Sequence, residues 1–223
     1  MFSVIRRHDL YYWLYVLFFV VMLWYQFNEP QFEAIYFFSA HRSVAADFFF
    51  TWITELGSFA PYVVALIVFI FLKNKEQVMK IAITAVLTAI FSYALKNFFL
   101  HDRPGTILEH EHLLNTINWV PSYGILKGHF SFPSGHSMSA FAFWTTIAFY
   151  FNSQRSVNGL KLEAGSRNLI FISLCFITAV LVCISRMYLG AHFPQDVITG
   201  SFIGITIATF VEYLVNYQLQ VKN

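Results

Sequence analysis

The stretch 130–137 (Phe-Ser-Phe-Pro-Ser-Gly-His-Ser) contains the residue types of an anion-binding helix start. Pro133 ends the segment before it, and a long apolar run follows. The first N–H groups of a helix have no acceptor inside the helix, and the helix dipole is positive at that end. Because Ser134 and Gly135 are small, these N–H groups can approach an anion closely. His136, beside them, is placed to pass a proton to or from a bound phosphate.

A second stretch, 96–104, places two cations close together in the chain. Lys96 falls near the end of an apolar run, and Arg103 directly precedes Pro104, which ends the helix. An ammonium group and a forked guanidinium group together can clamp a phosphate. The same two side chains could equally be anchors that reach from the apolar run to lipid headgroups. Taken alone, this stretch does not decide between the two.

The third stretch, 185–196, combines a cation, an imidazole and a carboxylate. Arg186 ends one apolar run, and His192 and Asp196 flank the start of the next. A spacing of four in a helical turn brings the carboxylate beneath the imidazole, and Pro194 is tolerated in a first turn. Asp196 would then orient the ring and leave its second nitrogen free as a nucleophile. Alternatively, Asp196 caps the helix and His192 satisfies a buried polar contact, which is the simpler interpretation of this stretch alone.

The composition indicates what kind of element must position these residues. Of the 223 residues, 57% are hydrophobic and only 12% are charged, whereas a soluble domain has about 25% charged residues. This favours an integral membrane protein folded as one domain, 1–223. A net charge of +2 without a dense basic cluster argues against nucleic-acid binding. Cys175 and Cys183 lie in one apolar run, where core positions are expected rather than a disulfide or a metal pair.

Six apolar runs, each near the ~20 residues that a bilayer core requires, predict an all-α bundle of six transmembrane helices. Their expected ranges are Leu10–Phe27, Gly57–Leu72, Met79–Leu100, His136–Phe151, Asn168–Met187 and Asp196–Tyr217. Between the first and second runs, the segment 33–56 mixes aromatic with charged residues, and we expect an interfacial helical segment on the membrane surface there. A long polar connection, 101–132, precedes the fourth run.

The basic residues predict the orientation of these runs. If the N-terminus is cytoplasmic, nine of the 14 Lys and Arg residues fall on the cytoplasmic side, as the positive-inside rule requires. These nine are Arg6, Arg7, Lys73, Lys75, Lys80, Arg155, Lys161, Arg167 and Lys222. With six spans, both termini are then expected in the cytoplasm.

With this topology the three stretches lie on the same outer face. Two helix C-termini contribute cations there, and two helix N-termini contribute N–H groups and imidazoles. Lys96, Arg103 and Arg186 lie on the less basic face, where charges at a membrane edge need a reason to be present. Their convergence with the two histidines predicts a single phosphate site and outweighs the separate structural explanations.

In this order, the patterns Lys-x6-Arg-Pro, Pro-Ser-Gly-His and Ser-Arg-x5-His-x3-Asp resemble the three signature motifs of the type-2 phosphatidic acid phosphatase superfamily. Every motif position is present, and the motif core, 96–196, covers a little under half of the chain. The six-run layout extends the resemblance to nearly all of it. The motif set is specific for the superfamily and poorly specific for the substrate. The resemblance implies a membrane lipid phosphatase of the phosphatidylglycerophosphatase type.

The resemblance also implies a role for each matched residue. His192 would be the nucleophile and form a phosphohistidine, Asp196 would orient it, and His136 would protonate the leaving oxygen. Charge would be stabilised by cations and helix ends, so that neither a metal nor another cofactor is required. The implied phosphate-binding residues are Lys96, Arg103, Ser134, Gly135 and Arg186.

We therefore expect a phosphatase in a bacterial inner membrane, with its site facing the periplasm. A site at the membrane plane favours a phospholipid, polyprenyl or glycolipid phosphate over a soluble substrate. Undecaprenyl pyrophosphate, phosphatidylglycerol phosphate, phosphatidic acid and lipid A phosphates are all candidates, and neither their ranking nor the oligomeric state follows from the sequence. Two alternatives stay open. One is a lipid phosphotransferase with the same site, and the other is a non-catalytic lipid-phosphate binding or transport protein, which would need no nucleophile.

Overall fold

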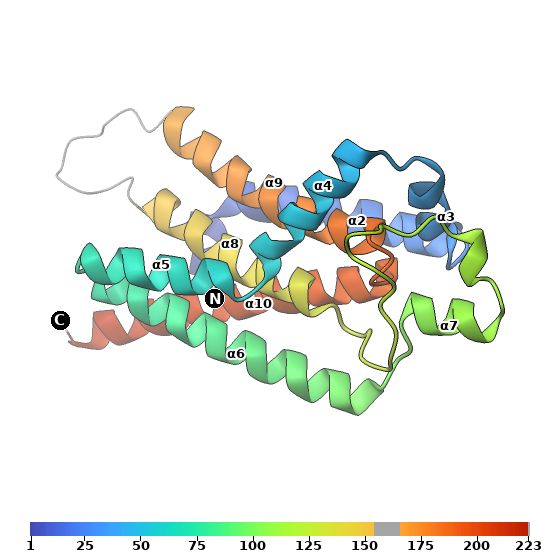
Figure 1. Ribbon diagram of the computed structural model, residues 1–223. Coiled ribbons are helices and arrows are strands. Elements are labelled where there is room, and N and C mark those ends of the chain that lie inside the picture. Colours follow the sequence, from blue (N-terminus) through green and yellow to red (C-terminus); the bar gives the residue numbers. More distant parts are fainter. Residues whose placement is uncertain (154–165, 223) are drawn as a thin grey trace.

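The computed structural model describes residues 1–153 and 166–222, and every regular element within them is a helix (Figure 1). The all-α class predicted from the apolar runs is thus confirmed. Long helices run along an elongated bundle, and the short helix α7 (Pro104–His110) covers one end together with a long loop. The C-terminus lies at the opposite end.

All six predicted runs fall in helices. Their bounds are α2 (Asp9–Asn28), α5 (Ala60–Phe71), α6 (Lys75–Phe99), α8 (Gly135–Ser153), α9 (Ser166–Tyr188) and α10 (Pro194–Lys222). The polar loop between the fourth and fifth runs, with Arg155 and Lys161, lies outside the described residues.

Four segments of the described chain, which contain α2, α6, α9 and α10, are long and apolar enough to cross a bilayer. A fifth candidate joins α4 (Val44–Ile53) and the 3-10 turn η1 (Thr54–Gly57) to α5 across a bend of 56°. Helix α5 alone has 12 residues, or about 18 Å, against a bilayer core of about 30 Å. The count of six spans therefore remains a prediction.

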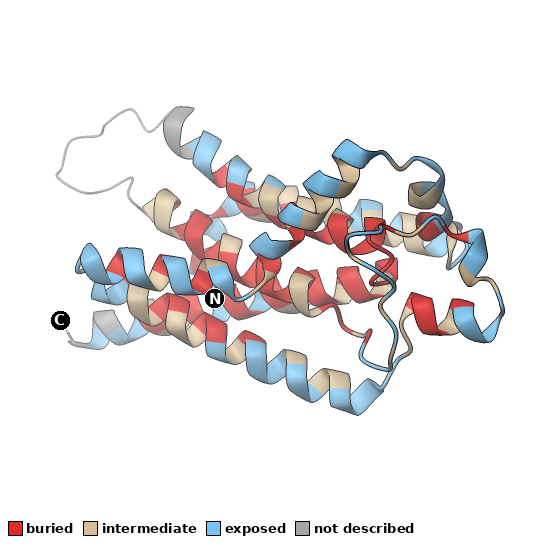
Figure 2. Ribbon diagram, viewed as in Figure 1, coloured by how far each residue is buried: buried red, intermediate tan, exposed pale blue. Residues whose placement is uncertain are grey.

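Helix α8 lies at the centre of the bundle, between α9 and α10, and most of its residues are buried (Figure 2). A helix enclosed by protein needs no continuous lipid-facing surface. It can therefore hold Ser137, Thr145 and Thr146, all buried, at positions where a lipid-exposed helix would hold aliphatic residues. These polar side chains explain why α8 lacks the hydropathy of a lone membrane span.

Two glycines bring α10 directly against α8. A Cβ atom at Gly200 would lie 2.5 Å from the Ser134 carbonyl oxygen, and one at Gly204 would clash with the Met138 carbonyl oxygen. Small residues four apart allow two helix backbones to approach closely, as is common in membrane bundles. The first turns of α8 and α10 are therefore held side by side.

The segment predicted to lie on the membrane surface contains α3 (Glu33–Ala40), α4 and η1. Ser43 caps α4, because its hydroxyl accepts a hydrogen bond from the Ala46 N–H at 3.2 Å. Both α4 and η1 pack against α9. The helices are as predicted, but their position on the membrane surface remains a prediction, since α4 also fits a bent span with α5.

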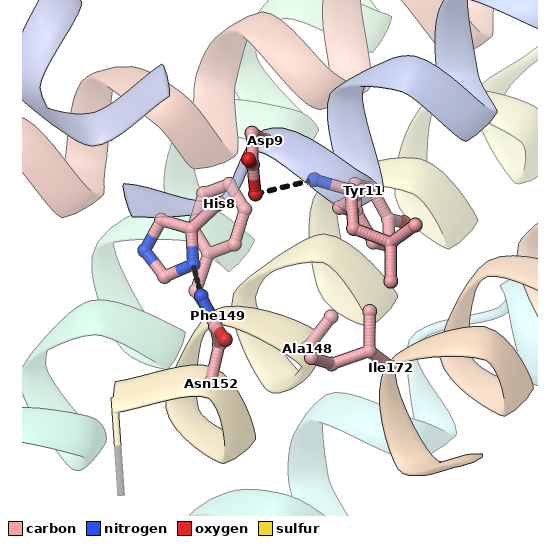
Figure 3. Close-up of a pocket in the computed structure, with 8 residues that line it drawn as sticks. His8, Asp9, Tyr11, Ala148, Phe149, Asn152 and Ile172 are labelled. Carbon is pink, nitrogen blue, oxygen red and sulfur yellow. Dashed lines mark hydrogen bonds between the residues drawn. The ribbon is translucent and has the colours of Figure 1, made fainter. Parts of the chain in front are cut away.

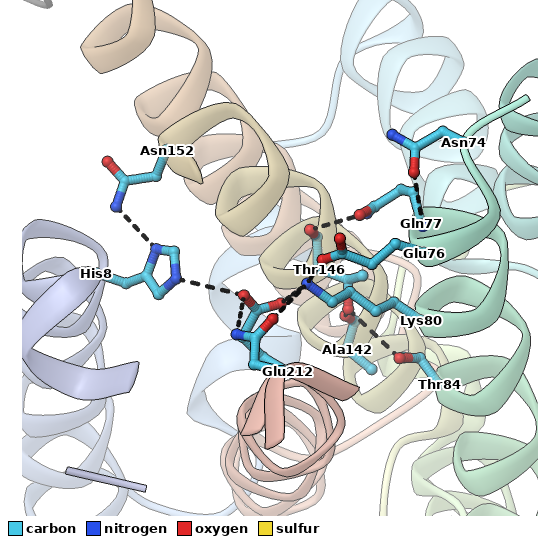
Figure 4. Close-up of polar contacts among 11 residues, drawn as sticks. His8, Asn74, Glu76, Gln77, Lys80, Thr84, Ala142, Thr146, Asn152 and Glu212 are labelled. Carbon is cyan, nitrogen blue, oxygen red and sulfur yellow. Dashed lines mark hydrogen bonds and ion pairs between the residues drawn. The ribbon is translucent and has the colours of Figure 1, made fainter. Parts of the chain in front are cut away.

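Away from α7, buried polar side chains from several helices meet (Figure 4). The Lys80 ammonium on α6 lies 2.8 Å from a Glu212 oxygen on α10 and 2.6 Å from a Glu76 oxygen. His8 follows α1 (Phe2–Arg7), and its Nε2 lies 3.9 Å from Glu212. Its Nδ1 accepts a hydrogen bond of 2.8 Å from the Asn152 amide at the end of α8. This network ties the N-terminal segment to α6, α8 and α10.

The His8 ring also closes a small cavity in this region (Figure 3). It stacks on Phe149, with the ring centroids 3.9 Å apart. The cavity has a volume of about 30 Å³ and is also lined by Tyr11 and Ile172, which leaves room for about one water molecule. The N-terminal segment is thus packed into the bundle by both polar and aromatic contacts.

Candidate active site

Four helix ends meet at the end of the bundle that α7 covers. Helix α6 ends at Phe99 and is followed by Leu100, whose backbone is left-handed (φ 49°); Lys96 lies in the last turn of the helix. Arg186 lies in the last turn of α9, which is followed by Gly190 at φ 62°. Helices α8 and α10 begin here, the latter with a proline that suits a first turn. The alternation of helix ends and starts thus gathers cations and N–H groups at this end of the bundle.

His192 lies in the short connection between α9 and α10, and its side chain is buried. Its Nδ1 is 3.2 Å from Oδ2 of Asp196 in the first turn of α10. The same carboxylate oxygen accepts hydrogen bonds from the Ser131 hydroxyl at 2.5 Å and from the Phe193 N–H at 3.1 Å. Because a carboxylate accepts, Nδ1 carries the ring proton and Nε2 keeps its lone pair.

Burial and charge act together on the His192 ring. Burial lowers the pKa of His192 well below its usual range, and the positive charges of Arg186, Arg103 and Lys96 lower it further. The ring is therefore neutral at neutral pH, and within the described residues Nε2 has no hydrogen-bond partner. A neutral, oriented imidazole with a free lone pair is the form that can attack phosphorus.

The first turn of α8 is built around Ser134. Its hydroxyl accepts hydrogen bonds from the N–H (3.4 Å) and the hydroxyl (3.0 Å) of Ser137, so Ser134 caps the helix. Its own N–H donates to the Asp196 carbonyl at 3.0 Å. The next two N–H groups, those of Gly135 and His136, have no hydrogen-bond acceptor among the described residues. They are the donors that an anion would meet here, whereas Ser134 is already engaged.

Gly135 lets Lys96 reach the start of α8. A Cβ atom at position 135 would lie 3.3 Å from the Lys96 ammonium nitrogen and 2.9 Å from the Ser92 hydroxyl oxygen. The ammonium group therefore lies against the helix N-terminus, where both it and the dipole attract negative charge. A side chain at position 135 would displace it.

Arg186 is held from two sides. It is 2% exposed, and Nη1 donates to the Thr54 hydroxyl of η1 at 2.7 Å and to the Tyr123 hydroxyl at 2.8 Å. Its Nε is buried and has no partner among the described residues. A buried guanidinium N–H without a partner costs free energy, and a bound phosphate would supply the missing acceptor.

Arg103 joins the site through backbone contacts. Its Nη1 donates to the Ala191 carbonyl at 3.0 Å and its Nη2 to the Phe130 carbonyl at 3.4 Å. These carbonyls adjoin the other two motifs, so Arg103 links all three stretches. Burial lowers the pKa of Arg103, and the charge of Arg186 lowers it further. Two guanidinium groups near each other favour binding of an anion between them.

The structure brings the predicted residues to one end of the bundle. His136 is half-buried at the start of α8, and the charges that act on its ring are those of Arg186, Lys96 and Arg103, with His192 also nearby. Sequence reasoning did not assign a role to three further side chains here, those of Ser131, Thr54 and Tyr123. Ser131 lies inside the quoted stretch 130–137. The other two come from distant segments that no spacing rule connects to the motifs.

The model of the PAP2 superfamily matches residues 77–220, which is more than half of the chain. The chain belongs to the PAP2 superfamily. The resemblance inferred from the three motifs is thereby confirmed. Relatives include a phosphatidylglycerophosphatase B from Bacillus subtilis, which is 34% identical over 46% of this chain and 51% of its own length. A lipid A 4'-phosphatase from Porphyromonas gingivalis is 26% identical over 74% of this chain and 64% of its own length.

Solved structures of the PAP2 superfamily have the same fold. Aquifex aeolicus LpxE matches with a TM-score of 0.60 at 29% identity and covers 83% of this chain and 97% of its own. A transmembrane PAP2-type phosphatidylglycerolphosphate phosphatase from Bacillus subtilis matches with a TM-score of 0.65 at 22% identity, over 93% of this chain and 96% of its own. The second likeness concerns the fold alone. In sequence, the chain spans about half the length of the Bacillus subtilis relative described above.

Proposed function

We propose that this protein is an integral membrane phosphatase that hydrolyses a lipid phosphate or pyrophosphate through a phosphohistidine on His192. One observation supports this most directly. A buried, neutral imidazole held by Asp196 lies among three cations, and one of them, Arg186, has a buried N–H without a partner among the described residues. We propose residues 1–223 as a single phosphatase domain with its motif core at 96–196.

In the first step, His192 Nε2 attacks phosphorus and forms a P–N bond. The bond between phosphorus and the leaving oxygen breaks, and His136 gives that oxygen a proton. The substrate's negative charge favours the protonated form of His136, because an anion close to an imidazole raises the pKa of the ring. The charge that develops on the non-bridging oxygens is stabilised by Lys96, Arg103, Arg186 and the N–H groups at the start of α8.

In the second step, water attacks the phosphohistidine from the side that the leaving group has vacated. His136, now neutral, accepts a proton from this water. The P–N bond breaks, its electron pair returns to Nε2, and inorganic phosphate leaves. Asp196 keeps the His192 ring in one tautomer throughout. In this proposal no step uses a metal, because the cations and the helix end supply the positive charge.

The membrane setting favours lipid substrates. The relatives include proteins named as phosphatases of phosphatidylglycerophosphate, lipid A and undecaprenyl diphosphate, and we propose a substrate from these classes or phosphatidic acid. We further propose that the site faces the periplasm of a bacterial inner membrane and that both termini are cytoplasmic. The uneven distribution of Lys and Arg supports this orientation.

The test is phosphate release by purified protein in detergent with excess chelator, over those four lipid classes. We expect release by the wild type, and a loss of roughly 10⁴-fold or more in kcat for His192→Ala, with inorganic phosphate still bound. Lys127→Ala, which changes an exposed residue paired with Glu109, is the matched control and should keep full activity. Normal turnover by His192→Ala would refute the nucleophile. Product that appears only with a second lipid acceptor would indicate a phosphotransferase, and binding without turnover a binding or transport protein.

A further inference from the structure

Tyr123 belongs to the long loop 101–132, outside all three motifs, yet its hydroxyl reaches the site. Within that loop, the backbone turns at Val120, whose carbonyl accepts hydrogen bonds from the N–H groups of Tyr123 (3.1 Å) and Gly124 (3.0 Å). Gly124 has φ 75°, a conformation that favours glycine. After this turn the phenol lies at the end of α9, where its hydroxyl meets Arg186, and the Tyr123 side chain is only partly exposed.

The hydrogen bond to Arg186 determines whether the Tyr123 hydroxyl is still free to donate a hydrogen bond. A guanidinium group has donors only, so the phenol oxygen accepts the 2.8 Å bond from Nη1. The phenol hydrogen therefore remains to be donated. Among the described residues it has no acceptor, and the two charged side chains that act on the phenol, Arg186 and Arg103, are both cations. A free donor near two arginines is available to an anion that these cations attract.

The Tyr123 ring is held firmly enough for this role. It packs against a small buried cluster that contains Val120, Tyr188 and Leu189. The guanidinium carbon of Arg186 also lies 5.7 Å from the ring centroid, which adds a cation–π attraction. The phenol is thus placed by packing on α9, and Arg186 does not have to hold it alone.

The loop is fixed in turn by a clamp on its far side. Arg42, between α3 and α4, donates to the Asn118 carbonyl at 2.7 Å and also to the Trp119 carbonyl. Asp47 on α4 pairs with Arg42 and accepts a 2.6 Å hydrogen bond from the Tyr188 hydroxyl. These contacts connect α4, the loop and the end of α9, so the position of Tyr123 is set by the fold.

We propose that Tyr123 is a further substrate-binding residue, whose hydroxyl donates a hydrogen bond to an oxygen of the phosphate group that Arg186 binds. The inference deepens the proposed function and rests on it for the identity of the anion. It assigns part of the long loop to phosphate recognition. The ligand chemistry is a phosphate monoester or the terminal phosphate of a pyrophosphate.

Tyr123→Phe tests this inference, because it keeps the ring and removes the hydroxyl. We expect kcat/KM for the lipid phosphate to fall about 10- to 100-fold, which is the range for one hydrogen bond to a charged group. The affinity for inorganic phosphate should fall with it. It is measured for each protein as the shift of the unfolding midpoint that phosphate causes, with that protein's own midpoint without phosphate as the reference, because the substitution also removes an acceptor of Arg186. Tyr93→Phe, at an exposed tyrosine on α6, is the matched control and should change nothing.

A second pair of variants separates donation to substrate from support of Arg186. In Tyr123→3-fluorotyrosine, the phenol is a stronger donor and a weaker acceptor. At a pH where this phenol is still protonated, phosphate affinity should hold or rise if it donates to phosphate, and should fall if it only supports Arg186. Thr54→Val removes the other acceptor of Arg186. The loss of phosphate affinity in this variant measures how much binding depends on a hydrogen bond that only holds Arg186 in place.

These outcomes keep the two proposals apart. If the wild type hydrolyses lipids and Tyr123→Phe does so equally well, Tyr123 is not a substrate contact, while the phosphatase function stands. If the wild type hydrolyses nothing but binds inorganic phosphate, and Tyr123→Phe binds it less well, the contact stands and the phosphatase function fails. A fall in affinity with 3-fluorotyrosine would overturn the inference even if Tyr123→Phe is impaired.

Discussion

At the scale of single residues, the site is defined by how His192 is kept neutral and aimed. Asp196 accepts from one ring nitrogen, and the Ser131 hydroxyl donates to the same carboxylate oxygen. With the Phe193 N–H, this oxygen has three donors, which fixes the carboxylate and, through it, the ring. Nearby cations oppose protonation of His192 and favour binding of a phosphate. The same charges thus prepare both the nucleophile and its target.

A first prediction concerns the protonation of His192. Since burial and cations lower its pKa well below the usual range, the ring should stay neutral as the pH falls from 8 to 6 and should accept a proton only below that. Nitrogen-15 NMR of histidine-labelled protein in detergent measures this directly. In Arg103→Gln, one opposing charge is gone, and titration should move to higher pH. A His192 signal that titrates near 6.5, the value of a histidine in an unstructured peptide, would contradict the prediction.

Some of these contacts can be predicted from the sequence and others cannot, for physical reasons. His192 and Asp196 are four apart across a helix start, so local geometry predicts their contact. Ser131 lies within the stretch 130–137, but its contact with Asp196 depends on how α8 and α10 are packed. Thr54 and Tyr123 reach Arg186 from segments far away in the chain. Contacts of this kind follow from tertiary structure, and one sequence contains no signal for them.

At the scale of elements, the site depends on the close contact between α8 and α10. The glycines Gly200 and Gly204 place the α10 backbone against carbonyl groups of α8. Because the carbonyl groups belong to the backbone, they cannot move aside as a side chain could. His136 and Asp196 lie in the first turns of these two helices, so the contact sets the distance between the proton donor and the carboxylate that orients His192.

Gly204→Ala tests this dependence. The added methyl group meets the Met138 carbonyl, and we expect a loss of about 1–3 kcal/mol in the free energy of unfolding, the usual cost of overpacking. Chemical unfolding in detergent, followed by circular dichroism, measures it. Thr206→Ala, on the exposed side of the same helix, should have little effect. Equal stability of the two variants would show that α8 and α10 can separate at low cost.

The sequence predicted where helices lie better than which of them cross the membrane. Apolar runs identify α2, α6, α9 and α10, since each of these helices exposes apolar side chains along part of its length. Helix α8 is enclosed by protein. Its hydropathy therefore does not indicate whether it crosses the membrane. The bend between η1 and α5 was not predicted either. The predicted run begins at Gly57, whereas the apolar character continues back into α4.

At the scale of the whole molecule, the two ends of the bundle differ in how their buried charges are paired. The end with the site gathers cations whose partner would be a substrate. The other end pairs the buried Lys80 with the buried Glu212 and with the exposed Glu76. A buried charge that loses its partner is costly, so the second end is expected to contribute to stability and not to chemistry.

Glu212→Gln should therefore lower stability by about 3 kcal/mol, the scale for one partner lost from a buried pair, because Lys80 loses its buried counter-charge. Activity per folded molecule should be unchanged, since the site lies at the far end of α10. Glu76→Gln removes the more exposed partner of the same lysine and should cost less than about 1 kcal/mol. Unfolding midpoints and initial rates on the same samples measure both effects. A large loss of activity in folded Glu212→Gln would show that the two ends are coupled.

The proposed orientation can be tested by labelling introduced cysteines in intact cells. His110→Cys, at the exposed end of α7, should react with a membrane-impermeant maleimide, whereas Ser3→Cys should react only after the membrane is opened. The native Cys175 and Cys183 are buried and give a low background. Reaction of Ser3→Cys in intact cells would overturn the proposed topology.

The glycine contact between α8 and α10 has a further consequence for how the protein responds to its bilayer. The proton donor His136 and the carboxylate that holds the nucleophile, Asp196, lie on this closely packed pair of helices, whereas Lys96 reaches the site on a long side chain at the end of α6. Thinner or thicker bilayers tilt helices at small cost. Such tilting would change how the phosphate is gripped more than how the P–O bond is broken. Lipid thickness should therefore act mainly on KM, and kcat should be comparatively insensitive to the composition of the membrane.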